Sequence, residues 1–433
     1  MFAIRKSPAG DSEWLYQDQQ TKKRRMTRLI HTLLLTMLLL TPSVSRAASE
    51  AAAAPDSLEQ LKPDYITASL LVVSPAAEPY SLFGHCALRL QCPDHKMDYC
   101  FTFETPTDAK GLYDFFRGKA MGGFAAAPTP AYLEYYRNAG RGVAQHQLNL
   151  TPKEKLMLWQ HADKEIVRGG CYRYNYLHTQ CASMVIDLIT SVLPSSVDYR
   201  QLPAQTNGSF RDQMLTESAP YPWSRFFWQT IMGPAGDEMG PIEHKLTPHT
   251  LPEVWRQATL TDDNRHIISG DAEILTAGLS PVAIHPSSIW HGLLTPTGVF
   301  TILLLLVVVI TIGQWYLGWK RLPFLIDSVL LAAYILLAFG LTALVLLSDL
   351  EATQWNWYLL VFNPLPLLLW AFRRKWLPEI CTCLIVAILI LLVLTPFVAQ
   401  LDLPHALFMA TFAIRLLLKS NIKTIKTLKP QRI

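Results

Sequence analysis

A cysteine at the expected start of a helix is the side chain of this sequence best placed to act as a nucleophile. Cys181 closes a polar, aromatic segment that reads YNYLHTQC. The apolar residues after it recur three, four, seven and eight positions on, and they are Met184, Val185, Leu188 and Ile189. This spacing predicts one apolar helical stripe, so Cys181 lies in or just before the first turn. Unpaired N–H groups and the helix dipole favour a thiolate there.

A thiolate nucleophile needs a base, and His85 is the strongest candidate. The run SLFGHCALRLQC alternates as a strand does, and it places His85 in the strand after Gly84, which leaves room for close approach. The return strand of the expected hairpin, residues 99–103, and the residue after it offer Thr102 or Glu104 as the group that orients the ring. In such a pair the sulfur attacks an acyl carbon, while the imidazole moves a proton to or from the leaving or entering group.

Both residues also have plainer interpretations. A free cysteine is most often a small buried hydrophobe, and a lone histidine is most often structural. His178 is a second candidate base, but it precedes the helix and is expected to shape the approach to Cys181. A zinc site is a further alternative, although the spacing matches no standard zinc finger. Its ligands would come from His85, Cys86, Cys92, His95 and Cys100.

The N-terminus has the features of an export signal. Residues 29–40 form a short apolar run, preceded by Lys and Arg residues and followed by small residues around Ala47. A permanent span needs about 20 apolar residues, so a signal peptide over residues 1–47 is favoured over a retained anchor. Met26 is an alternative start to Met1. Much of the basic excess behind the net charge of +4 lies in this leader and in the C-terminal tail, which together with export disfavours a nucleic-acid-binding protein.

Export would place five of the seven cysteines in an oxidising compartment, where disulfides are stable. Cys92 and Cys100 flank a turn-like segment, so a disulfide between them would close the base of the hairpin. Cys86 and Cys171 form a second candidate pair. These pairings leave Cys181 as the odd thiol, although spacing alone does not fix the connectivity.

The exported part reads as a mixture of strands and helices. Further strands are predicted over residues 65–73 and 143–150, and Thr151 opens a helix with Glu154 in a capping box. The stretch from residue 193 to 286 is rich in Pro and Gly and is predicted to be irregular. An aromatic cluster within it is either core or a lipid-interface contact, and its members are Trp223, Phe226, Phe227 and Trp228.

The last third of the chain has the composition of a membrane domain. Five apolar segments follow residue 293, and the third and fifth are short for spans. Lys and Arg residues follow the first, third and fifth segments, whereas acidic residues follow the second and fourth. By the positive-inside rule, this pattern places the N-terminal domain outside and the tail inside. The segments are 294–317, 324–347, 355–370, 377–398 and 406–418.

The expected organisation therefore has five parts. They are a signal peptide (1–47), a linker (48–63), an exported domain (64–290), a transmembrane domain (291–420) and a basic cytoplasmic tail (421–433).

Several motifs, taken in order, resemble one known family. They are FGHCALRL, CFTFETP, GLYDFFRG, EYYRNAGRGVAQHQLNLT and YRYNYLHTQCASMVIDL. From Asp64 to about Leu251 the chain is similar to the periplasmic domain of Lnb-type lipoprotein N-acyltransferases, and the membrane part resembles the same family. The order of histidine before cysteine is also similar to circularly permuted NlpC-like and LRAT-like acyltransferases. The resemblance implies a papain-like α+β domain followed by an α-helical bundle of about five spans.

The resemblance also implies an activity. His85 and Cys181 match the histidine and cysteine of the family, so Cys181 would take an acyl chain from a phospholipid as a thioester and pass it to the N-terminal amine of a diacylglyceryl-cysteine lipoprotein. No cofactor or metal is implied, and the expected location is the bacterial inner membrane with the catalytic domain in the periplasm. Gln180 stands where the family usually has Asn and is a candidate oxyanion donor, and Cys86 stands where Thr is usual.

Two other functions remain open at this point. An NlpC-like cell-wall peptidase or amidase would use the same Cys–His pair on an amide, but it has no evident use for five spans. A non-enzymatic membrane scaffold would keep Cys181 buried and inert.

Overall fold

The computed structural model describes residues 65–76, 81–200, 208–276 and 289–420. The expected signal peptide (1–47), linker (48–63) and basic tail (421–433) lie outside the described residues. The expected disulfide partners, the candidate active-site residues and the apolar segments all fall within them.

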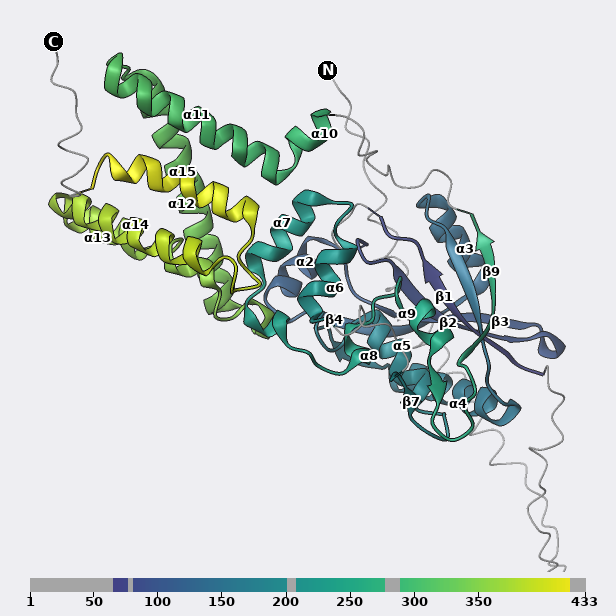
Figure 1. Cartoon of the computed structure of the whole chain (residues 1–433). Coiled ribbons are helices and arrows are strands. Elements are labelled where there is room, and N and C mark those ends of the chain that lie inside the picture. Colours follow the sequence, from purple (N-terminus) through teal and green to yellow (C-terminus); the bar gives the residue numbers. More distant parts are fainter. Residues whose placement is uncertain (1–64, 77–80, 201–207, 277–288, 421–433) are drawn as a thin grey trace, which may run out of the picture. The chain divides into compact units, whose positions relative to one another are not determined.

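A seven-stranded antiparallel sheet forms the framework of the N-terminal domain (Figure 1). The strand order is β6-β4-β3-β2-β1-β5-β9, so the predicted hairpin of β2 and β3 lies in the middle. The predicted strand from residue 81 begins only at His85, because Ser81 to Phe83 form a turn. The strands are β1 Thr67–Val73, β2 His85–Cys92, β3 Met97–Glu104, β4 Met121–Pro128, β5 Val143–Leu148, β6 Cys171–Arg173 and β9 Ile268–Leu275.

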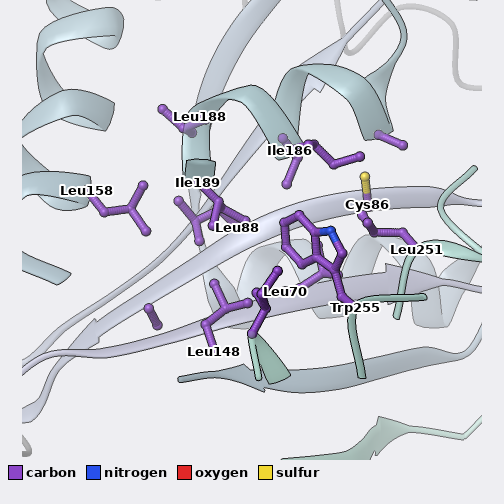
Figure 2. Packing of buried hydrophobic residues seen from close by; sticks show 14 of the residues in the cluster. Leu70, Cys86, Leu88, Leu148, Leu158, Ile186, Leu188, Ile189, Leu251 and Trp255 are labelled. Atoms are coloured by element: carbon purple, nitrogen blue, oxygen red, sulfur yellow. The ribbon is translucent and has the colours of Figure 1, made fainter. Parts of the chain in front are cut away.

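Each face of the sheet has its own cover of helices. The main core lies between the sheet and helices α4 (Pro152–Arg168), α5 (Cys181–Thr190) and α9 (Leu251–Gln257). Figure 2 shows strand side chains such as Leu88 of this core beside Ile186 and Ile189 of α5. Each such buried aliphatic side chain contributes about 1.5–3 kcal/mol. The opposite face packs on the tyrosines of α3 (Thr129–Asn138).

The helix predicted from Thr151 is confirmed as α4. The Thr151 hydroxyl accepts a hydrogen bond from the Glu154 N–H, and the Glu154 carboxylate accepts one from the Thr151 N–H. The same carboxylate receives two hydrogen bonds from Arg265, at 2.9 and 2.8 Å. The cap is therefore also a tertiary contact that joins α4 to the chain before β9.

The prediction of an irregular stretch from residue 193 to 286 is wrong for most of its described part. Ser209 caps α6 (Phe210–Glu217), and Pro222 takes a first-turn position in α7 (Pro222–Ile231), where a missing N–H costs nothing. The short helix α8 (Ile242–Lys245) follows, and β9 is an edge strand. The apolar alternation of β9 is weak because Gly270 and Asp271 interrupt it.

The C-terminal part is a set of apolar helices. In the part of the chain that the structure describes, three helices are long and apolar enough to cross a membrane. They are Pro296–Tyr316 (α11), Arg321–Leu347 (α12) and Arg374–Leu394, which contains α14 (Leu377–Leu394). Among the described residues, the third and fifth predicted segments form the shorter apolar helices Trp357–Phe372 and Leu403–Leu417 (α15).

The third segment is short because it breaks at Asn363 and Pro364, just before α13 (Leu365–Phe372). Backbone groups freed inside an apolar bundle need internal partners. The buried Tyr334 hydroxyl supplies them, since it lies 2.9 Å from the Val361 carbonyl and 3.0 Å from that of Asn363. The Asn363 side chain in turn accepts the Leu365 N–H at 3.0 Å.

Candidate active site

The site begins where the chain enters β2 through a glycine that no other residue can replace without strain. Gly84 has φ of +80°, and a Cβ there would lie 2.6 Å from the Val73 carbonyl oxygen. Only glycine takes this conformation freely. The close approach to Val73 holds His85 at the start of β2, paired with the last residue of β1.

The ring of His85 is oriented by two groups on β3. Its Nε2 atom lies 2.6 Å from the Thr102 hydroxyl oxygen and 3.3 Å from the Glu104 carboxylate. The Thr102 hydroxyl donates to Glu104 at 3.1 Å. Because that proton is committed, the Thr102 oxygen accepts from His85, so Nε2 carries a hydrogen. The other ring nitrogen, Nδ1, is left for a proton acceptor or donor elsewhere. The structure thus brings both predicted orienting residues to His85.

Cys181 is the first residue of α5, as its spacing predicts. Its side chain is half-buried and packs against the main core, in which Cys86 is completely buried. The helix is fixed by its apolar face, where Val185 and Ile189 are also completely buried. The sulfur therefore sits at the N-terminus of a rigid helix that rests on the strand carrying His85.

The electrostatics of the pair favour an ionised sulfur. Hydrogen bonding to the Cys86 thiol and then to His85 lowers the pKa of Cys181 well below its usual value, against the effect of burial. Burial lowers the pKa of His85, but Tyr136, Glu104 and Cys181 outweigh it and raise the net pKa well above the usual range. A thiolate beside an imidazolium is the state that both shifts favour.

The orienting carboxylate is itself kept ionised. Desolvation raises the pKa of Glu104, but His85 and the Thr102 hydroxyl lower it by more, so the net shift of the pKa is downward. Burial raises the pKa of Cys86, and the neighbouring Cys181 raises it further, so Cys86 stays a neutral thiol that donates to its neighbour. The two pKa shifts thus favour ionisation of Cys181 and not of the adjacent Cys86.

Gln180 caps α5, but its side-chain amide is used elsewhere. The amide nitrogen donates to the Leu246 carbonyl at 3.0 Å and lies 3.4 Å from that of His244. The Gln180 N–H donates to the Ser183 hydroxyl, which donates to the His178 carbonyl, each at 3.0 Å. These bonds hold the segment before Cys181 in place. The first backbone N–H groups of α5 lie at the same end of the helix as the sulfur.

The predicted disulfide between Cys92 and Cys100 is absent, and both are free, buried thiols. The strand register explains this, because β2 and β3 pair Cys100 with Arg89 and Cys92 with Met97. The second candidate pair is also absent. Cys86 is buried beside Cys181, among Ile186, Leu251 and Trp255 (Figure 2), whereas Cys171 is exposed on β6.

Two residues near the site were not singled out by the sequence reasoning. The Tyr136 ring of α3 lies 6.4 Å from the His85 ring, and the Arg141 guanidinium lies 5.2 Å over the Tyr136 ring. Arg141 also donates to the Ser74 carbonyl at 2.8 Å and to the Ser81 hydroxyl at 3.3 Å. Both residues lie in the motif EYYRNAGRG, but the sequence alone does not show that they lie near His85. Only the arrangement of the sheet and α3 brings them there.

An aromatic wall stands next to residues 173–180, which form the approach segment of Cys181. Tyr176 lies 5.6 Å from Trp228 and 5.9 Å from Phe115, measured between ring centres. Of the aromatic cluster predicted as core or lipid contact, Trp228 is buried in this wall, whereas Trp223 and Phe227 are 48% and 41% exposed. The core expectation is confirmed for Trp228, and lipid contact of the exposed residues stays a prediction.

The approach segment also meets the loop that follows α12. Arg173 of β6 forms an ion pair with Asp349 at 2.7 Å, and the Asp349 N–H donates to the Arg117 carbonyl at 3.0 Å. His178 lies 3.6 Å from Glu351. These contacts join the segment that leads to Cys181 to the end of a helix long enough to cross a membrane.

Two family models match this chain. The first, the Lnb N-terminal periplasmic domain, matches residues 53–211, and the second, the Lnb transmembrane domain, matches residues 287–429. The first segment contains His85 and Cys181, and the second contains every helix from α11 to α15. No curated protein and no solved structure matched.

Proposed function

Because the chain belongs to the Lnb family, with a periplasmic α+β domain followed by a transmembrane domain, we propose that it transfers an acyl chain from a phospholipid to a lipoprotein. The acceptor is the N-terminal amine of a diacylglyceryl-cysteine lipoprotein. The observation that carries this proposal is the thiol at the start of α5, whose pKa is lowered by Cys86 and His85. A low-pKa thiol beside an oriented imidazole is the equipment of acyl transfer through a thioester.

In the first half-reaction the Cys181 thiolate attacks the ester carbonyl of the phospholipid. The first N–H groups of α5 point at the oxyanion that forms. As the intermediate collapses, the C–O bond breaks, and the His85 imidazolium gives its proton to the departing alkoxide. The products are a lysophospholipid and an acyl thioester on Cys181, with His85 neutral.

In the second half-reaction the lipoprotein amine attacks the thioester carbonyl. Neutral His85 takes a proton from the attacking nitrogen while the C–S bond breaks. The products are an amide on the lipoprotein and the original thiolate–imidazolium pair. Thr102 and Glu104 stabilise the imidazolium at both stages, since one accepts the Nε2 hydrogen and the other lies 3.3 Å from it.

The membrane part supports this choice of substrates. The loop after α12 contacts the approach segment of Cys181 through Arg173 and Asp349. We infer five spans in the bacterial inner membrane, with this loop on the periplasmic side, because Lys and Arg follow the first, third and fifth apolar segments. Donor and acceptor are both anchored in the outer leaflet, so a tethered site replaces two searches in solution.

The arrangement of the N-terminal domain is also consistent with a permuted papain-like domain. A helix that starts with the nucleophile packs on an antiparallel sheet, and the strand carrying the histidine comes earlier in the chain. The order His85 before Cys181 is that of the NlpC-like and LRAT-like enzymes named above.

The test is mass spectrometry of lipoprotein N-termini in a strain that lacks its own N-acyltransferase. Expression of the wild-type protein restores N-acylation, Cys181→Ala does not, and Cys171→Ala, which changes an exposed cysteine on β6, behaves as wild type. Full N-acylation by Cys181→Ala would contradict the proposal. Release of peptides from purified murein by the full-length protein would instead favour the amidase alternative.

A further inference from the structure

An apolar cavity of about 200 Å³ lies among the helices of the C-terminal part, outside the candidate active site. It is walled by α7, α11, α12, α15 and the short turn Trp357–Leu360. The walls include Phe226, Phe300, Ala333, Leu337, Tyr358 and Phe408.

The polar atoms on these walls already have partners. The Thr230 hydroxyl donates to the Phe226 carbonyl at 2.7 Å and lies 2.8 Å from His405 Nε2, and His405 Nδ1 is bonded to Asp402. The Tyr358 hydroxyl donates to a carbonyl of the loop before α15, that of Gln400, at 2.7 Å. The surface that remains for a ligand is therefore apolar. Such a surface binds a hydrocarbon and offers no hydrogen bond to a polar group.

The cavity lies near the start of α11 and of α15, and it extends to the middle of α12. Phe300 is four residues from the start of α11, which is a depth of about 6 Å at 1.5 Å per residue. Along α12 the lining runs from Leu341 to Ala333, six to fourteen residues from the end of the helix, which are depths of about 9 to 21 Å. These are the ends assigned to the periplasmic side, and half of a bilayer core is about 15 Å thick. The cavity thus spans the depth of outer-leaflet acyl chains and extends to about the middle of the bilayer.

We propose that this cavity binds an acyl chain of an outer-leaflet phospholipid. The inference rests on the topology in the proposed function. Phospholipid is the solvent at this depth, and Leu336 at the rim of the cavity is 75% exposed, so a chain enters from the side without leaving the hydrocarbon. An apolar cavity of about 150 Å³ already binds benzene in another protein, and each methylene that fills a void restores lost dispersion contacts.

Helix α7 connects the cavity to the candidate active site. Phe226 and Thr230, one turn apart, face the cavity. Trp228, between them in sequence, belongs to the aromatic wall and contacts Tyr176, five residues before Cys181. One helix therefore separates the bound chain from the segment that positions the nucleophile. A phospholipid held in the cavity has its ester end at the membrane surface where that segment meets the loop after α12.

The test uses the full-length Cys181→Ala protein in bilayer nanodiscs that contain a phosphatidylethanolamine with a photoactivatable acyl chain. Two neighbouring alanines of α12 give a matched pair, because Ala333 lines the cavity and Ala332 is exposed outside it. We expect crosslinks to map to the cavity walls, to fall at least fivefold in Ala333→Phe, and to persist in Ala332→Phe. Equal crosslinking in both variants, or crosslinks spread evenly over exposed helix faces, overturns the proposal.

Two further measurements keep the outcome interpretable. Thermal unfolding reports whether Ala333→Phe is folded, and Ala333→Leu fills less of the cavity and is expected to give an intermediate loss of crosslinking. Because Cys181 is absent throughout, crosslinking does not depend on acyl transfer. If no crosslink maps to the cavity walls while the wild-type protein still N-acylates lipoproteins, only the cavity proposal is rejected. If crosslinks map to the cavity but the wild-type protein gives no N-acylation, only the proposed function is rejected.

Discussion

Two histidines, one in the sheet domain and one among the apolar helices, have almost the same polar neighbours. His85 lies beside a threonine hydroxyl and a carboxylate, Thr102 and Glu104. His405 also lies beside a threonine hydroxyl and a carboxylate, Thr230 and Asp402. By residue type alone, either trio could serve an acid–base site.

The geometry separates them. Thr102 and Glu104 both approach Nε2 of His85, which leaves Nδ1 for the Cys181 thiol. In His405 the two polar neighbours take one ring nitrogen each, and the two ring faces are stacked on Phe226 at 4.2 Å and on Tyr358 at 4.5 Å. A histidine whose nitrogens and faces are all used is a packing element. Under the proposed function, the nitrogen of His85 that remains free for Cys181 makes the site, and a hydroxyl–carboxylate pair alone does not.

The same substitution at each of the two histidines distinguishes them. His85→Gln removes the partner of the thiolate, so at pH 7 the sulfur reverts to mostly thiol, and we expect alkylation of Cys181 by iodoacetamide to slow by about 10- to 100-fold. Acyl transfer should fall by about 10²–10⁴-fold. His405→Gln should leave Cys181 alkylation unchanged while unfolding becomes easier by about 1–3 kcal/mol. Equal alkylation rates in the two variants contradict the distinction.

A smaller effect is expected from the carboxylate of the reactive trio. Glu104 raises the pKa of His85, so Glu104→Gln lowers it, and the imidazolium that protonates the leaving alkoxide is lost at a lower pH. The alkaline limb of the acyl-transfer pH profile should move to lower pH, with about a tenfold loss of rate at neutral pH. Glu134→Gln, on the exposed surface of α3, is the control. An alkaline limb that stays in place would show that Glu104 is only structural.

The smallest expected effect comes from the second thiol. Its hydrogen bond lowers the pKa of Cys181, so Cys86→Ala raises that pKa and moves the acid limb of Cys181 alkylation to higher pH. The rate at neutral pH should fall by about two- to fivefold, since His85 still stabilises the thiolate. Cys92→Ala removes another buried thiol from the same strand and should leave the pH profile unchanged. Identical profiles for the two variants would remove Cys86 from the electrostatics of the site.

Sequence patterns predicted the elements whose signals are local. The apolar spacing after Cys181 and the capping box at Thr151 both depend on residues within two turns of one helix, and both helices form as predicted. The hairpin that carries His85 and Thr102 was also visible in the alternation of its strands. These contacts join near neighbours in sequence, so their geometry follows from helix and strand periodicity.

Long-range placement was not predictable in the same way. The turn between Cys92 and Cys100 favoured a disulfide, but the strand register places Met97, not Cys100, opposite Cys92. The register of a strand pair depends on long-range packing. Cys86 and Cys181 are 95 residues apart in sequence, and they meet because α5 packs on the sheet. No local sequence pattern encodes this contact. Gln180 was a candidate oxyanion donor by its position in the sequence. In the structure its amide nitrogen donates to the Leu246 carbonyl at 3.0 Å, a contact that the sequence does not reveal.

Acyl transfer through Cys181 is tested by the intact mass of the full-length protein after incubation with a single phospholipid species and no lipoprotein acceptor. The wild-type protein should gain the mass of one acyl chain, the adduct should map to Cys181 and be released by hydroxylamine as a thioester is, and addition of the acceptor should discharge it. Cys181→Ala should gain nothing. N-acylated lipoprotein formed by a wild-type protein that never carries this adduct, or an adduct that persists in Cys181→Ala, would contradict acyl transfer through Cys181.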